Sequence, residues 1–277
     1  MKYGVIITGG PVEEQIELAR AAEVAGWDGV FTWDGIHLGD QVEVHDPWVL
    51  MSAFAMATDR VRIGAVIQPL ARRRPWKVAR EAVTLDHVSK GRFVLCVGLG
   101  AVDDSGWARV GEPSDRRTRA ERLDETLQIL TGLWTGEPFG FRGKHYTFEP
   151  MAFRPTPIQQ PRIPIWVVGA WPSERSMDRA IRYDGLLPHA LGGRDYGPAL
   201  IAEIRDWVRE RRSLDGFEIV VEGTTSADDA QDATAEARRW ADAGATWWID
   251  ADWSSMDPAA VRQAAERRLR AGPPRVD

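Results

Sequence analysis

Cysteine is nearly absent from this chain of 277 residues, and its single copy, Cys96, can form no internal disulfide bond. Cys96 lies in an apolar run typical of a strand, so we expect it to be buried and chemically inert. The chain also lacks any run of about 18 apolar residues, which argues against a membrane-spanning helix. Its first residues lack the basic start and long apolar core of a signal peptide. Together these absences predict a cytoplasmic protein that contacts no membrane.

Lysine is scarce as well, and occurs only as Lys2, Lys77, Lys90 and Lys144. A Schiff-base aldolase needs a desolvated lysine at a reactive position. None of these lysines follows a predicted strand, so that class is disfavoured. The net charge of −6 gives no sign of a partner such as nucleic acid or an anionic membrane. A small molecule is therefore the expected partner.

The most informative stretch is residues 84–100, TLDHVSKGRFVLCVGLG. Its helical pattern ends at Lys90 and Gly91, because glycine can adopt the left-handed conformation of a helix C-terminus. Residues 93–97 form a continuous apolar run, as in a strand covered on both faces of a parallel sheet. Gly98 and Gly100 follow, where glycine allows close approach of a ligand or of another chain segment. Taken alone, the two glycines favour close packing over ligand contact.

Strands and helices alternate along the whole chain. Strands are predicted at residues 3–8, 28–33, 61–67, 93–97, 165–168, 185–188, 218–221 and 246–249, and a helical pattern follows each. Eight units of about 35 residues match a (β/α)8 TIM barrel, whereas a doubly wound sheet rarely has so many. We predict one TIM-barrel domain over residues 1–277. An insertion between the fourth and fifth strands, at residues 135–164, is expected to contain a hairpin near residues 141–146.

In a TIM barrel the reactive groups stand at the C-terminal ends of the strands. The candidates there are Gly9, Trp33, Asp34, Gln68, Gly98, Gly100, Gly169, Trp171, His189, Glu222, Asp250 and Trp253. The histidines show no paired spacing at strand ends, so we predict no metal site. A metal-dependent hydrolase or lyase would have to use His189 with Asp250.

Residues 168–173, VGAWPS, join a strand end to a predicted helix start. The free N–H groups and the dipole at a helix N-terminus favour a phosphate group, and Ser173 adds a hydroxyl. An ordinary capped helix explains the same residues equally well.

Several motifs occur in a fixed order. They are residues 27–34 (WDGVFTWD), 73–75 (RRP), 84–92 (TLDHVSKGR), 97–100 (VGLG), 122–125 (RLDE), 155–157 (PTP) and 164–169 (PIWVVG). Each is loose alone, but their order and spacing resemble the bacterial-luciferase-like family of flavin- and deazaflavin-dependent oxidoreductases. The resemblance spans roughly residues 2–253. It implies a TIM barrel that binds FMN or coenzyme F420 in its mouth, and a homodimer.

The resemblance also implies roles for residues. The end of the third strand would lie against the cofactor ring, and in this family it often carries a non-proline cis peptide bond. The glycines after the fourth strand would line the ring or tail, and the loop after the fifth would lie beside the phosphate. The implied cofactor-binding residues are Ala65, Val66, Ile67, Gly98, Gly100, Gly169, Ala170 and Trp171.

The chain departs from the family pattern at the acid–base group. Many deazaflavin-dependent members carry Asp-His directly after the second strand, with the histidine as proton donor. Here Asp34 is followed by Gly35, and His37 comes two residues later. Members with a sugar-phosphate substrate carry a glutamate after the strand-four glycines, where this chain has Asp103 and Asp104. We predict Asp34 and His37 as the catalytic polar groups.

These features predict an FMN- or F420-dependent oxidoreductase of the luciferase-like monooxygenase type. Trp33, Trp107 and Trp253 would wall a pocket for a small apolar substrate. With FMN, the reduced flavin would activate oxygen, and a flavin reductase is the implied electron source. With F420, the reaction would be hydride transfer without oxygen. A metal-dependent barrel hydrolase or lyase and a cofactor-free partner subunit of the same fold are the remaining alternatives.

Overall fold

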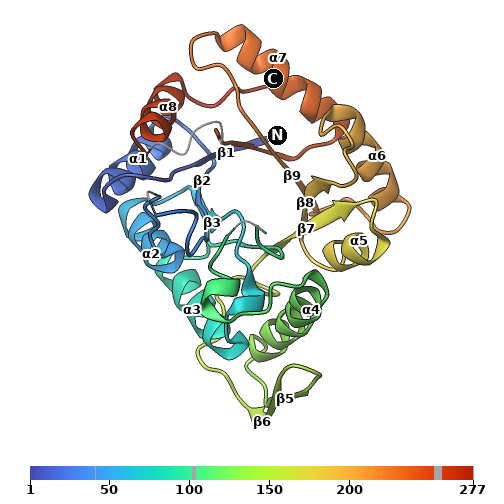
Figure 1. Ribbon diagram of the computed structural model, residues 1–277. Coiled ribbons are helices and arrows are strands. Elements are labelled where there is room, and N and C mark those ends of the chain that lie inside the picture. The colour runs from blue at the N-terminus through green and yellow to red at the C-terminus, as the bar shows by residue number, and fades with distance from the viewer. Residues whose placement is uncertain (41, 102–103, 253–257, 277) are drawn as a thin grey trace.

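Parallel strands form a nearly closed barrel with helices around it (Figure 1). The computed structural model describes the whole chain except residues 41, 102–103, 253–257 and 277. In these described residues the eight barrel strands are β1 (Lys2–Ile6), β2 (Gly29–Thr32), β3 (Arg62–Ala65), β4 (Leu95–Val97), β7 (Ile165–Trp171), β8 (Gly185–Ala190), β9 (Glu218–Gly223) and β10 (Trp247–Asp250). They pair in the order β3-β2-β1-β10-β9-β8-β7-β4, and isolated bridges link β3 to β4. The predicted (β/α)8 fold is confirmed.

Helices follow the strands and pack on the outside of the barrel (Figure 1). Their bounds are α1 (Val12–Val24), α2 (Pro47–Ala57), α3 (Pro75–Val88), α4 (Arg116–Leu133), α5 (Glu174–Ala180), α6 (Pro198–Arg209), α7 (Ala230–Ala243) and α8 (Pro258–Ala271). Two short 3-10 turns, η1 (Leu70–Arg72) and η2 (Ala108–Val110), lie after β3 and β4. Proline stands in the first turn of α2, α3 and α6, where its missing N–H costs no helical hydrogen bond.

Aromatic side chains fill the interior of the barrel. Phe31, Trp166 and Trp247 pack together, with ring centroids 5.2 to 6.0 Å apart. Gly29 makes room for them, because a Cβ atom there would come within 2.7 Å of the Phe31 ring and 3.0 Å of Trp247. Cys96 is fully buried in the same cluster, and burial raises the pKa of its thiol well above its usual value. The interior is thus a packed core rather than a channel, as in other TIM barrels.

The insertion between β4 and β7 contains the predicted hairpin, made of β5 (Phe139–Arg142) and β6 (Thr147–Met151), which projects at the bottom of Figure 1. Two carboxylates of α4 hold its turn. Glu125 accepts hydrogen bonds from the backbone N–H groups of Lys144, His145 and Tyr146. Glu121, one helical turn earlier, accepts a hydrogen bond from Lys144 Nζ at 2.7 Å.

Protonation of Glu121 should weaken this anchor. Hydrogen bonds from Lys144, His145 and Arg117 lower the pKa of Glu121 from 4.5 to about 2. Because the folded-state pKa lies below the unfolded-state value, the carboxylate stabilises the fold above about pH 4.5, and this contribution is lost as the pH falls toward 2. We predict that Glu121→Gln lowers the thermal unfolding temperature at neutral pH and that the difference from the wild type shrinks over this acid range. A difference that does not change with pH would contradict the assignment.

Candidate active site

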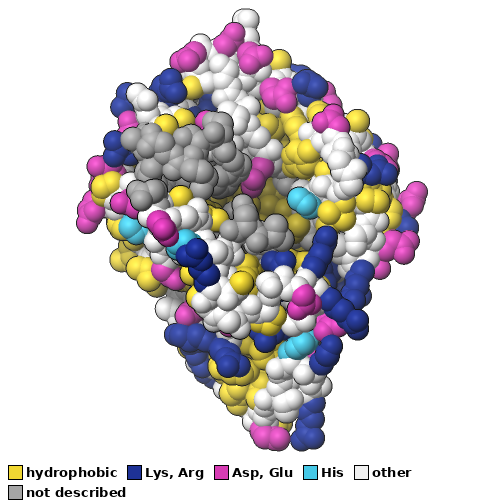
Figure 2. All heavy atoms as spheres, in the orientation of Figure 1, with side chains coloured by type: hydrophobic (Ala, Val, Ile, Leu, Met, Phe, Trp, Pro, Cys, Tyr) yellow, Lys and Arg dark blue, Asp and Glu magenta, His cyan; other side chains and the backbone are white. Residues whose placement is uncertain are grey.

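A cavity of about 780 Å³, here called the mouth cavity, opens at the C-terminal ends of β3, β4, β7, β8 and β9. Its apolar lining includes Val66, Ile67, Val168, Leu187 and Val220. Hydrophobic side chains are visible in the hollow of this face (Figure 2). The volume falls within the range of small-molecule sites, and the position is where TIM barrels carry their chemistry.

Part of the predicted cofactor site lines the mouth cavity. Val66, Ile67, Gly98, Gly100 and Ala170 all contribute to its surface. The Val66–Ile67 peptide bond is cis, as the resemblance implies for this position. Close packing also explains why glycine stands at these two positions. A Cβ atom on Gly98 would come within 2.3 Å of the Ile67 side chain. Gly100 has φ +83° and packs against Pro69 and Trp107.

Three predicted cofactor residues do not line the cavity. Ala65 is buried in the core shared by the strands and the helices. Gly169 faces the helical layer, because a Cβ atom there would meet Leu186 and Met177. Trp171 packs against Trp207 of α6, with ring centroids 5.8 Å apart. Alternate residues of a strand point to opposite faces, so Ala170 can face the mouth while its two neighbours face outward.

The predicted tryptophan walls lie elsewhere in the described residues. Trp33 donates a hydrogen bond from Nε1 to the Thr8 hydroxyl and is not part of the cavity lining. Trp107 is buried, and the guanidinium groups of Arg72 and Arg119 lie 5.2 and 4.8 Å from its ring centroid. The prediction for Trp253 falls outside the described residues.

Four arginines around the cavity were not identified from the sequence: Arg116 and Arg119 of α4, Arg179 of α5, and Arg194 after β8. Arg119 is only 3% exposed and donates hydrogen bonds to the carbonyl groups of Leu99 and Gly100 at 3.0 and 3.3 Å. Its Nε atom is buried without a hydrogen-bond partner. Arg179 pairs with Asp124, and Arg194 pairs with Glu203 at 3.4 Å. The cavity lining thus contains four arginines and one carboxylate, that of Glu222, so its edge is cationic.

Asp34 and His37, the predicted catalytic pair, do not line the mouth cavity. The Asp34 carboxylate is buried and accepts hydrogen bonds from Arg72 and Arg73, each at 3.0 Å. His37 is partly exposed, and its ring nitrogens lie 2.6 Å from Ser105 Oγ and 3.0 Å from Asp40 Oδ1. Their catalytic roles stay predictions.

Arg72 joins three loops at the mouth. It donates to Asp34 after β2 and to Asp104 after β4, the second at 2.5 Å. Asp104 also accepts the backbone N–H groups of Ile36, His37 and Gly106. Burial alone would raise the pKa of Asp104, but hydrogen bonds from Arg72 and from the backbone outweigh it and lower the pKa. Asp104 is therefore held as a carboxylate.

Titratable groups at the cavity include His189, Tyr196 and Glu222. Burial raises the pKa of Tyr196, whose hydroxyl accepts the backbone N–H of Glu222 at 3.4 Å. Asp250, the predicted alternative partner of His189 for a metal, lines a second pocket instead. Within the described ranges no three His, Cys, Asp or Glu side chains converge as metal ligands.

The helices of the described residues also include none with the length and apolar character needed to span a membrane.

Comparison with known proteins defines the class. The family model described as luciferase-like monooxygenase matches residues 3–275, and the chain therefore belongs to the luciferase-like monooxygenase family. The motifs that suggested this family in the sequence identified it correctly.

Individual relatives differ in cofactor. The chain is 30% identical over 244 residues to an F420-dependent glucose-6-phosphate dehydrogenase of Nakamurella multipartita, covering 84% of this chain and 69% of that protein. It is 29% identical to the oxygenase component of a flavin-dependent trigonelline monooxygenase of Acinetobacter baylyi, covering 58% of this chain and 44% of that protein. Among solved structures, an F420-dependent secondary alcohol dehydrogenase in complex with an F420-acetone adduct matches with a TM-score of 0.81 and 18% identity. That match covers 100% of this chain and 99% of the other, and it supports the fold.

The Arg72 network allows a stability test. Arg72 is 2% exposed, and its loss would leave the buried carboxylate of Asp104 without its arginine partner and that of Asp34 with Arg73 alone. Removing one partner of a buried ion pair costs about 3–5 kcal/mol. We predict a loss of this size for Arg72→Met in chemical denaturation. The control Arg73→Met removes a side chain that is 23% exposed and should cost about 1 kcal/mol or less. Equal losses for the two variants would refute the central role of Arg72.

Proposed function

We propose that this chain is an F420-dependent oxidoreductase that transfers a hydride between the deazaflavin and a small organic substrate. The observation that carries the proposal is the mouth cavity, which combines an apolar floor with a cationic edge. A planar heterocycle needs apolar walls, and an anionic tail needs arginines. When bound, the cofactor supplies the hydride chemistry, and the protein supplies position and electrostatics.

The residues present fit such a group. Val66, Ile67 and Gly98 offer an apolar surface for the ring. Arg119 carries a buried Nε donor without a partner, and leaving such a donor unpaired is costly. A bound anionic group beside α4 would supply the missing acceptor. Arg116 and Ser176, which also line the cavity, add a charge and a hydroxyl group on the same side.

Similarity favours F420 over FMN. The F420-dependent dehydrogenase of Nakamurella multipartita aligns with 84% of this chain, whereas the flavin-dependent oxygenase component aligns with 58%. A flavin-dependent monooxygenase is the second candidate, supported by that oxygenase relative. It would need a separate flavin reductase as partner, so the two candidates differ in cofactor and in their need for oxygen.

Cofactor titration tests the proposal. Addition of F420 to the purified protein should give saturable binding with a change in the 420 nm absorbance, and FMN should bind more weakly. We predict that Arg116→Gln weakens F420 binding about tenfold, because an arginine contact to an anion is worth about 1.5 kcal/mol. The control Arg117→Gln changes the neighbouring exposed arginine, which does not line the cavity, and should leave binding unchanged. Tighter binding of FMN than of F420 would support the oxygenase instead, and binding of neither would refute both.

We further propose that the protein forms a homodimer through α2. This helix carries no charged residue between Pro47 and Ala57. Val49 and Met56 are seven residues apart, so they lie on the same side of the helix, and they are 73% and 78% exposed. Val24 of the neighbouring helix α1 is 87% exposed. An uncharged helix with exposed apolar side chains is typical of an interface.

Light scattering after size exclusion tests the dimer. We predict a dimeric mass for the wild type and a monomeric mass for Met56→Glu, because a buried charge at the interface would have no counter-charge. The control Val110→Glu places the same charge at another exposed apolar site, on η2, and should stay dimeric. A monomeric wild type at micromolar concentration would rule out the proposal.

A further inference from the structure

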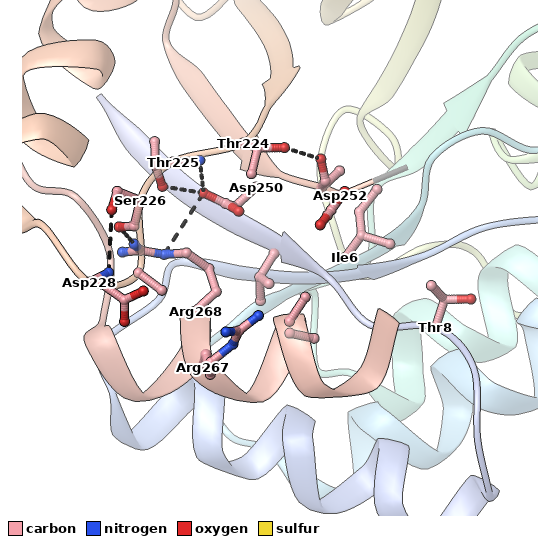
Figure 3. Close-up of a pocket in the computed structure, with 15 residues that line it drawn as sticks. Ile6, Thr8, Thr224, Thr225, Ser226, Asp228, Asp250, Asp252, Arg267 and Arg268 are labelled. Atoms are coloured by element: carbon pink, nitrogen blue, oxygen red, sulfur yellow. Dashed lines mark hydrogen bonds and ion pairs between the residues drawn. The ribbon is translucent and has the colours of Figure 1, made fainter. Parts of the chain in front are cut away.

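A second pocket, here called the α8 pocket, lies between α8 and the C-terminal ends of β1, β9 and β10 (Figure 3). Its volume is about 240 Å³, which is room for about eight water molecules at the liquid volume of about 30 Å³ each. Ala251 lines both this pocket and the mouth cavity. A molecule in the α8 pocket would therefore lie next to the proposed cofactor site.

The lining of the α8 pocket differs from that of the mouth cavity. It combines hydroxyl groups, carboxylates and guanidinium groups, from Thr8, Thr224, Thr225, Ser226, Asp228, Asp250, Asp252, Arg267 and Arg268. Figure 3 shows Thr8 after β1 and the other groups at the end of β10, on the loops after β9 and β10 and on α8, with Arg268 directed toward Asp250. The pocket thus presents both donors and acceptors.

One buried donor in this pocket lacks a hydrogen-bond partner. Arg268 is 6% exposed, and its terminal nitrogens donate to the carbonyl groups of Ser226 and Gly272. Its Nε atom is buried and makes no hydrogen bond. The nearest carboxylate oxygen, Oδ2 of Asp250, is 3.9 Å away, which is too long for one. Asp250 Oδ2 is already bound by the hydroxyl and the N–H of Thr225.

Buried polar groups are normally paired, so this donor indicates that an oxygen atom from a ligand belongs in the pocket. TIM barrels often bind phosphate at the loops after their seventh and eighth strands, which here are β9 and β10. In this chain, however, Asp228, Asp250 and Asp252 bring three carboxylates against the two guanidinium groups of Arg267 and Arg268. A dianion would be repelled, whereas the hydroxyl groups of a neutral molecule can both donate to carboxylates and accept from arginine.

We propose that the α8 pocket binds the hydroxylated part of the substrate, which is a small polyhydroxylated molecule of the size of a triol to a hexose. This inference rests on the proposed function, because the reacting carbon would have to reach the mouth cavity past Ala251. It replaces the purely apolar substrate expected from the tryptophans, since Trp33 and Trp107 do not line the mouth cavity.

Filling the pocket tests the inference. Ala265 lines it from α8, and Ala265→Leu adds apolar volume there without touching the mouth cavity. The matched control is Ala271→Leu at the exposed end of the same helix. Binding of glycerol, sorbitol, glucose, cyclohexanol and inorganic phosphate is measured by saturation-transfer NMR, first without cofactor. F420 binding is measured separately on each variant.

We expect at least one of the three polyols to bind the wild type and Ala271→Leu alike, and to bind Ala265→Leu at least tenfold more weakly, with F420 affinity unchanged. Asp228→Asn, which removes one carboxylate with little change in volume, should also weaken polyol binding. It provides the test if Ala265→Leu does not fold. Polyol binding unaffected by either change, stronger binding of cyclohexanol, or competition by phosphate would overturn the inference. F420 binding without polyol binding would refute the pocket alone. Polyol binding without F420 or FMN binding would refute the proposed function.

Discussion

The arrangement of the mouth depends on one buried guanidinium group, that of Arg72. It lies between the carboxylates of Asp34 and Asp104 and over the ring of Trp107. These contacts tie together the loops that follow β2, β3 and β4. A buried ion pair adds little net stability, because desolvation cancels much of the attraction. Its effect is on geometry, since moving one of these loops alone would separate a buried charge from its partner.

The same network reaches the mouth cavity through Trp107. Arg119 of α4 stacks on the Trp107 ring. It also donates hydrogen bonds to the carbonyl groups of Leu99 and Gly100, which line the cavity. Hydrogen bonds from the buried Arg119 thus fix the backbone at Leu99 and Gly100, just after β4. On the opposite side of the mouth, the loops after β9 and β10 present carboxylates and hydroxyl groups. The C-terminal end of the barrel therefore carries arginines on one side and both carboxylates and arginines on the other. This difference in charge favours one orientation of an anionic ligand.

The fold could be predicted from the sequence because parallel strands are continuous apolar runs and each is followed by a helical period. Strand ends were less certain, and β7 extends to Trp171 rather than to residue 168. The cationic edge could not be predicted, because Arg116, Arg179 and Arg194 come from separate elements. The spacing of apolar residues along a helix shows which residues are buried. It does not show which polar residues of the helix lie beside the cavity. The tryptophans were misleading for a related reason, since a large ring near a strand end can pack outward, as Trp171 does.

The motifs that identified the family are mostly parts of the scaffold. Asp34 of the motif at residues 27–34 binds Arg73 of the motif at 73–75. Asp86, fully buried on α3, accepts the N–H groups of Ile158 and Gln159, just after the motif at 155–157. The motif at 122–125 ends in Glu125, which holds the hairpin turn.

Arg92 completes this pattern, because it donates hydrogen bonds to the carbonyl groups of Ala55, Thr58 and Val61. Each of these side chains satisfies backbone or charged groups that the barrel would otherwise bury unpaired. These residues therefore serve the fold rather than a particular reaction. The choice of cofactor and substrate lies instead in side chains that the motifs do not contain, such as Arg116, Arg119 and the lining of the α8 pocket.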